Sequence, residues 1–177
     1  MVKKNICFIW TVSNGEHQTD DDANKKHLYE FARLVKLDFI FGTWENNDFK
    51  TLKTGNYIID NRYRVDFFGE LSEQVIKLDK SENKITYDKF IVEFNKILDT
   101  TNIIIVHDAK HHMRTIIAES VRANIPLRYD TKLLIDTISF KHDLDKPSIY
   151  DLAKKLKINA ETEIDLLKNV FIKLYKS

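Results

Sequence analysis

The chain has 177 residues, of which 43% are hydrophobic and 31% are charged, a composition typical of a globular domain with a full core rather than of a disordered chain. Its 28 lysines and arginines nearly balance its 27 aspartates and glutamates, which leaves a formal net charge of +1. A protein that binds nucleic acid over its whole surface usually carries a basic excess, so any such binding here would use a local face.

A single cysteine, Cys7, lies in an apolar segment and excludes an internal disulfide. This cysteine usage favours an intracellular location, cytoplasmic by default. The apolar run near the N-terminus is too short for a signal peptide, and no run approaches the roughly 18 residues of a membrane span. We therefore expect one domain over residues 1–177 that has no membrane partner.

The first third of the chain predicts strands joined by polar turns. Residues 5–12 are β-branched and aromatic, which indicates a central strand, and residues 13–15 are a turn signal. Residues 16–26 are polar and contain three successive aspartates, so we expect an exposed loop. Residues 28–41 fit a helix by some spacings, but their length and aromatic content also suit a long strand. A further strand is expected around residues 57–59.

The rest of the chain predicts alternating helices and strands. Thr86 and Ser148 are suited to cap helices, and one helix should stop before Pro126. We expect helices at residues 71–78, 87–98, 110–124, 149–156 and 161–175, and strands at residues 103–106 and 133–135. This order indicates an α/β fold in which helices cover a mixed sheet.

The most informative stretch is IIIVHDAKHHMRTI at residues 103–116, where an apolar strand ends in His-Asp-Ala and a helical pattern follows. This stretch resembles the second motif of the DEDDh 3′→5′ exonucleases, in which a strand leads through His-Asn-Ala-x-Phe-Asp into a helix. The segment KLLIDTISF, with Asp136 and Thr137, resembles the family's next strand, and the last two helices also follow the family's order. The N-terminal half matches only in outline, with FIWTVSNG in the place of a strand ending in Asp-x-Glu-Thr-Thr-Gly.

The resemblance implies a ribonuclease H-like mixed sheet of about five strands flanked by helices. It also implies the family's chemistry, in which two divalent metal ions, usually Mg²⁺ or Mn²⁺, generate the attacking hydroxide and stabilise the leaving 3′ oxygen. Such hard cations require clustered carboxylates, and a histidine near the last helix acts as the general base.

At the positions of the family's first two motifs, this sequence carries side chains that do not bind Mg²⁺. The two acids of the first motif fall on Trp10 and Val12, and the catalytic Asp of the second motif falls on His112. Trp10 and Val12 could equally be core residues of a central strand, although Trp10 is also suited to stack on a base.

The third motif leaves one possible survivor. Aligning the family's final Asp with Asp165 places Ala160 where the family has its general base. Glu161 and Glu163 are alternatives for the same acid, since the register of the last helix is open. Asp165 is thus a possible survivor of the catalytic side chains, and it is a weak candidate for a metal ligand.

Several polar side chains near these positions are candidates for binding rather than catalysis. The residues that we expect to contact nucleic acid are Trp10, His107, Lys110, His111 and Arg114. The competing interpretation is that His107 caps a loop at the end of its strand and that the basic residues form a solvated face. Asp136, also at a strand end, is expected to orient the loop.

These observations favour a catalytically degenerate exonuclease-fold domain that binds nucleic acid or a protein of nucleic-acid metabolism, with no cofactor. One alternative is an active 3′→5′ exonuclease whose Mg²⁺ or Mn²⁺ ligands have moved to Asp108, Asp136, Asp165 and either Glu16 or the aspartates at 20–22. Another is a structural or inhibitory subunit that binds protein through an exposed apolar patch near Trp44 or at Phe67 and Phe68.

Overall fold

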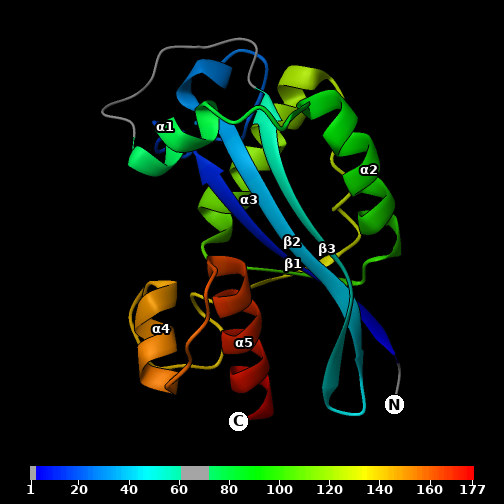
Figure 1. Cartoon of the computed structure of the whole chain (residues 1–177), viewed down its shortest axis with the longest axis vertical. Coiled ribbons are helices and arrows are strands. Elements are labelled where there is room, and N and C mark those ends of the chain that lie inside the picture. The colour runs from blue at the N-terminus through cyan, green and yellow to red at the C-terminus, as the bar shows by residue number, and fades with distance from the viewer. Residues whose placement is uncertain (1–2, 61–71) are drawn as a thin grey trace.

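The computed structural model describes residues 3–60 and 72–177, which form a twisted sheet flanked by helices (Figure 1). The strands in these ranges are β1 (Lys4–Ser13), β2 (Leu34–Glu45), β3 (Asp48–Asp60), β4 (Lys84–Thr86), β5 (Ile103–Val106) and β6 (Leu133–Asp136). Their order in the sheet is β4-β3-β2-β1-β5-β6, and it combines antiparallel and parallel neighbours. The α/β class with a mixed sheet is therefore confirmed.

The helices of the described ranges connect and cover these strands. Their bounds are α1 (Glu73–Asp79), α2 (Tyr87–Thr100), α3 (Ala109–Ala123), α4 (Ile149–Leu156) and α5 (Glu163–Lys176), with a short 3₁₀ helix at Leu28–Glu30. Each falls short of the length and apolar character that a membrane-crossing segment requires.

Most predicted elements are present, and the differences have local causes. Helix α4 has the predicted bounds because Ser148 and Asp151 form a reciprocal capping box at its start. The segment 28–41 is extended only from Leu34 onwards, after the short 3₁₀ helix, so the strand interpretation is correct for its second part. Strand β4 was not predicted, because three residues are too few to show a periodic pattern.

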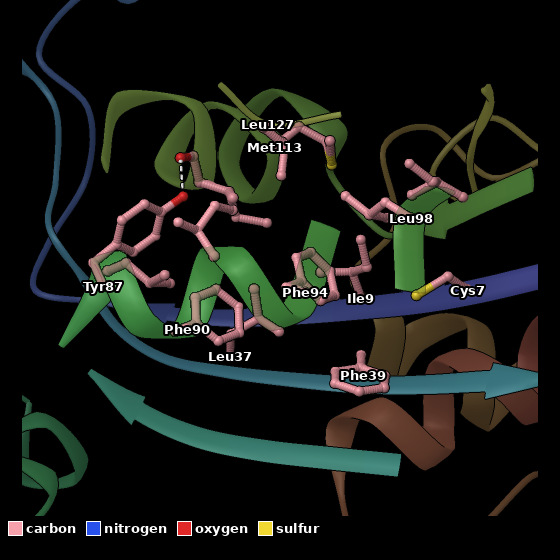
Figure 2. Close-up of a cluster of buried hydrophobic side chains, with 14 of the residues drawn as sticks. Cys7, Ile9, Leu37, Phe39, Tyr87, Phe90, Phe94, Leu98, Met113 and Leu127 are labelled. Carbon is pink, nitrogen blue, oxygen red and sulfur yellow. Dashed lines mark hydrogen bonds between the residues drawn. The ribbon is translucent and has the colours of Figure 1, made fainter. Parts of the chain in front are cut away.

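Side chains alternate along the central strands, so that the sheet packs a core on each face. On one face, Cys7, Ile9 and Phe39 contact α2 and α3, where Phe90 and Phe94 are almost fully buried (Figure 2). The opposite face packs against α4 and α5 through Ile6, Phe8, Ile40 and Ile105. Trp10 and Val12 continue the alternation of this second face beyond its core.

Strand β1 extends beyond the end of β5, its parallel neighbour, and this extension sets the position of the site. Its parallel pairing with β5 covers only Ile6, Cys7 and Phe8, whereas its antiparallel pairing with β2 continues to Ser13. Among the residues that the structure describes, no strand therefore pairs with the last part of β1 on its β5 side. The start of α3 lies beside this free edge, as the bond from the Thr11 backbone to α3 shows.

Trp44, near which an exposed apolar patch was expected, is itself buried, because α5 covers the end of β2. Trp44 is 8% exposed and packs edge-on against Phe171 and Tyr175 of α5. Of these aromatic side chains, Tyr175 is the exposed one, at 44%. Phe67 and Phe68 lie outside the described residues.

Candidate functional site

A cleft of about 500 Å³ opens at the end of the sheet where β1 runs past β5. One wall is the end of β1, with Trp10, Thr11 and Val12, and another is the turn between β5 and α3. The first residues of α4 and α5 close the remaining side. The first two motifs identified in the sequence therefore meet at one place.

The turn between β5 and α3 is held by Asp136 at the end of β6. Its carboxylate accepts the backbone N–H of Asp108 at 2.9 Å, of Ala109 at 2.7 Å and of Ile138 at 3.0 Å. Asp136 therefore orients the loop, as expected from its place at a strand end. Its oxygens are occupied by the backbone and are not offered to a metal ion.

His107 joins the end of β5 to the segment after β6. Its Nδ1 lies 2.9 Å from Oγ1 of Thr137, and that hydroxyl lies 3.2 Å from the Val106 carbonyl, to which it donates. Burial lowers the pKa of His107, while the Asp136 carboxylate and a hydrogen bond to the Pro147 backbone oppose that shift. This matches the loop-capping interpretation, although His107 also lines the cleft.

His112, which the motif resemblance aligns with the family's second-motif Asp, faces β1. Its Nδ1 lies 3.1 Å from the backbone nitrogen of Thr11 and 2.7 Å from Oγ1 of Thr11. Its ring centroid is 4.5 Å from that of Trp10. Burial lowers the pKa of His112 to about 3, and the nearby His111 and His107 add to this shift. The side chain is therefore a neutral imidazole near neutral pH instead of a carboxylate.

The two first-motif positions form an aromatic and apolar part of the cleft. Trp10 and Val12 both line it, and Trp10 also packs against the core beneath α4 and α5. Ala160, which falls on the family's general base only if the final Asp is aligned with Asp165, packs against the same core. The side chains of Trp10 and Val12 neither titrate nor bind metal.

A buried ion pair that the sequence did not reveal lies beside these residues. Asp38 of β2 is the register partner of Trp10, and Lys36 is that of Val12. The Asp38 carboxylate is 2.7 Å from the Lys36 ammonium. Burial raises the pKa of Asp38, and Lys36 opposes that shift. The pair could not be found from sequence, because it depends on the register between two strands.

His111 also lines the cleft and ties the loop after β1 to α3. Its Nε2 is 3.1 Å from Oγ of Ser13, and its Nδ1 is 3.3 Å from the Glu16 carboxylate. The ring of His17 packs against it at 5.2 Å, and Nδ1 of His17 accepts the N–H of Ala32 at 3.2 Å. The loop that was expected to be simply exposed is therefore attached at its start.

Lys110 and Arg114, two of the predicted nucleic-acid contacts, are not among the residues that line the cleft. Lys110 pairs with Asp20 at 2.6 Å. Arg114 donates to the Thr19 carbonyl at 3.0 Å and lies over the ring of Phe31 at 5.3 Å. Both cations hold the loop of residues 16–26, so the structure brings together only the other three predicted contacts.

The acid that α5 offers to the cleft is Glu163 rather than Asp165. Glu163 lines the cleft and accepts the hydroxyl of Tyr150 at 3.1 Å. Asp165 does not line it and instead accepts the hydroxyl of Thr162, the residue that caps α5, at 2.8 Å. The sequence left these two acids as alternatives, because a helix start is the least certain part of a pattern.

The donors at the cleft do not fit a pair of Mg²⁺ ions. Within residues 3–60 and 72–177, no three His, Cys, Asp or Glu side chains are grouped so that they could hold a metal ion. The carboxylates that do line the cleft each have a partner in the protein, and they are Asp108, Glu163 and Glu16. Two magnesium ions would need several unengaged oxygens from different segments.

Comparisons of the sequence with known proteins find no match, whereas comparisons of the fold with solved structures find many. No protein-family model matches the chain, and no curated protein matches it in sequence. Among solved structures, exonuclease I from Methylocaldum szegediense superposes with a TM-score of 0.66 at 10% identity, over 98% of this chain and 40% of that one. Cell-death related nuclease 4 gives 0.63 at 9% identity, over 97% and 63%.

A third match is E. coli exonuclease I in complex with a dA16 oligonucleotide, with a TM-score of 0.61 at 9% identity, over 98% of this chain and 40% of that one. The chain spans less than two thirds of each of these proteins. The structural similarity to DEDDh exonucleases covers nearly the whole chain, and it defines a ribonuclease H-like fold. At these identities the similarity concerns the fold alone.

Proposed function

We propose that this chain is an exonuclease-fold domain that does not cleave and that holds the end of a single nucleic-acid strand in the cleft. The observation that carries this proposal is that the cleft remains open, although the side chains expected to bind metal ions are replaced by others. Trp10, Val12 and His112 occupy the former acid positions, yet a space of about 500 Å³ remains between them and the starts of α4 and α5.

Two features of the cleft suit a nucleic-acid strand. The first is aromatic: Trp10 lines the cleft, and so does Tyr150, which is 56% exposed. A flat ring of this kind can stack on a base of any sequence. The aromatic pair therefore supports binding of an unpaired strand rather than of a duplex.

The second feature is the convergence of three helix starts. Asp108 is the N-cap of α3, Ser148 is the N-cap of α4 and Glu163 is the first residue of α5, and all three line the cleft. The backbone N–H groups and the dipole at a helix N-terminus favour a nearby anion. This field supports a phosphate ligand and offsets part of the negative charge of the three carboxylates that also line the cleft.

The test measures binding and cleavage separately. Fluorescence anisotropy with a labelled oligothymidylate in EDTA should show saturable binding, and incubation with Mn²⁺ should leave the strand at its full length. Trp10→Ala should weaken binding about tenfold, because stacking on one aromatic ring contributes this much. Tyr29→Ala, which removes a ring that is 58% exposed and outside the cleft lining, is the matched control.

Three outcomes would contradict the proposal. Shortening of the strand in Mn²⁺ that Glu163→Gln abolishes would show a working nuclease with relocated ligands. Equal affinity of the Trp10→Ala and Tyr29→Ala variants would place the strand elsewhere. Failure of DNA and RNA strands to bind, together with stable capture of a protein in nuclease-treated extract, would favour a protein-binding subunit.

A further inference from the structure

We propose that His112 donates a hydrogen bond from its Nε2–H to a phosphate oxygen of the bound strand. This neutral donor holds the phosphate without a metal ion. This rests on the proposed function, since it names the group that the cleft recognises. It goes beyond that function by assigning a metal-independent contact to one residue and by fixing the protonation state in which the residue acts.

The contact with β1 fixes the tautomer of His112. The backbone N–H of Thr11 can only donate, and it points at Nδ1 over 3.1 Å, so Nδ1 must be the acceptor. The Thr11 hydroxyl at 2.7 Å can donate to the same nitrogen. In a neutral imidazole the single proton must then be on Nε2. The strand that carries Trp10 therefore sets the direction in which His112 donates.

The Nε2–H is offered to the cleft rather than to the protein. His112 is 5% exposed and lines the cleft, and the described residues provide no hydrogen-bond partner for its Nε2. Nε2 is not among the buried side-chain atoms that lack a partner, so this donor is open to a ligand in the cleft. Trp10, whose ring lies 4.5 Å away, would place a stacked base beside this donor. A phosphate next to that base would be the natural acceptor.

The surroundings keep the imidazole neutral while a strand is bound. Its titratable neighbours are His111 on α3 and His107 just after β5, and both disfavour a further positive charge. No carboxylate raises the pKa of His112, whereas burial lowers it. The remaining charged groups that line the cleft are Glu16 after β1, Asp108 before α3, Lys146 before α4 and Glu163 on α5. The donor should therefore work unchanged over the range in which ordinary histidines titrate.

The test probes the ligand as well as the protein. The affinity of a labelled oligothymidylate is compared with that of the same strand whose last linkage is a neutral methylphosphonate. The wild type should lose about tenfold in affinity with the modified strand, as expected for a lost hydrogen bond to a charged group. His112→Phe should bind both strands equally, and His112→Gln, which restores an N–H, should recover part of the preference.

Two further measurements use the unmodified protein. Nitrogen-15 NMR should show His112 neutral with its proton on Nε2 throughout the range from about pH 5.5 to 8, in which free histidine titrates. The affinity for the unmodified strand should be constant over that range and should not change in EDTA. His27→Ala, at a partly exposed histidine that does not line the cleft, is the control variant.

A titration of His112 near its ordinary pKa, an equal methylphosphonate penalty in wild type and His112→Phe, or loss of binding in EDTA would each overturn the inference. These results differ from failure of the proposed function, in which neither strand binds to any variant. A variant that fails to fold does not decide the matter, because the NMR and EDTA measurements need only the wild type.

Discussion

The turn after β5 and the end of β1 face the same cleft, but they resemble the exonuclease motifs to different extents. In the turn, Asp136 and Thr137 are present and bind the backbone and the His107 side chain. At the end of β1, the motif resemblance aligns Trp10 and Val12 with acids of the family. We use the name frame for the interactions that Asp136, Thr137 and the buried Glu119 make with the rest of the chain. The name cleft stands for the residues that line the space of about 500 Å³.

The difference follows from what each kind of side chain does without a metal ion. A carboxylate that accepts backbone N–H groups stabilises the folded chain whether or not catalysis occurs. Acids gathered to bind two cations repel one another when the cations are absent. Under the proposed function, in which cleavage is not required, the frame residues keep their contribution to stability, whereas acids gathered at the cleft would only repel one another. Trp10, Val12 and the neutral His112 carry no such charge near neutral pH.

The largest expected effect is at Glu119, the buried acid of α3. It is 2% exposed, and it accepts from Arg33 at 2.6 Å, from Arg122 at 2.9 Å and from the backbone N–H of Leu34 at 3.2 Å. Glu119→Ala removes the carboxylate that these cations share and should lower the free energy of unfolding by about 3–5 kcal/mol. Urea denaturation at neutral pH measures the change.

Glu93→Ala is the matched control for that variant. Glu93 also belongs to a helix and also pairs with a cation, Lys96 at 2.7 Å, but both side chains are more than half exposed. Its removal should leave the midpoint of urea unfolding unchanged within error. If the two variants were equally stable, the frame would not depend on the Glu119 interactions and the comparison would fail.

The next effect concerns Asp136, whose carboxylate holds the turn at the cleft. Asp136→Ala removes the acceptor for the N–H groups of Asp108, Ala109 and Ile138, and it should cost about 2–3 kcal/mol of unfolding free energy. Because the turn positions His107 and Asp108, strand binding should also weaken. A variant as stable as the wild type would contradict the structural role assigned to this acid.

How much the sequence predicted depended on whether a signal was local. Helix α4 was predicted with its exact bounds, because Ser148 and its apolar stripe lie within a few residues of one another. The pairing of Trp10 with Asp38, and of Val12 with Lys36, depends on strand register and left no local signal. The motif resemblance led to Trp10 and His112, but it could not separate Glu163 from Asp165, since the two lie within one turn of the helix start.

A smaller effect should come from pH. The pKa of His112 is about 3 in the folded chain, below its ordinary value of 6.5, so the unfolded chain takes up the proton first. Its contribution is complete above about pH 6.5 and is lost as the pH falls, by up to about 1.4 kcal/mol per pH unit. His17 and His107, whose pKa values are also lowered by burial, act in the same direction.

His112→Phe isolates this contribution. The variant should lose less stability than the wild type between about pH 6.5 and 5.5, because the phenyl ring has no proton to bind. Urea denaturation of both proteins at the two pH values gives the difference. An identical pH dependence would mean that His112 is protonated as easily in the folded chain as in the unfolded one, contrary to the buried site assigned here.

The smallest effect is expected at Asp165, the one acid that the sequence alignment retained. Its carboxylate accepts the Thr162 hydroxyl at 2.8 Å and the Lys168 ammonium at 2.8 Å, so it belongs to the start of α5 and not to the cleft. Asp165→Ala should therefore cost roughly 0.5–1 kcal/mol, as for a helix-capping interaction, and should leave strand affinity unchanged. Glu163→Gln, two residues earlier, should change strand affinity while leaving stability nearly intact, because it alters the one α5 acid that lines the cleft. The opposite result, in which Asp165→Ala affects binding and Glu163→Gln does not, would place the ligand on the Asp165 side of the α5 start. The strand would then not contact Trp10 or His112.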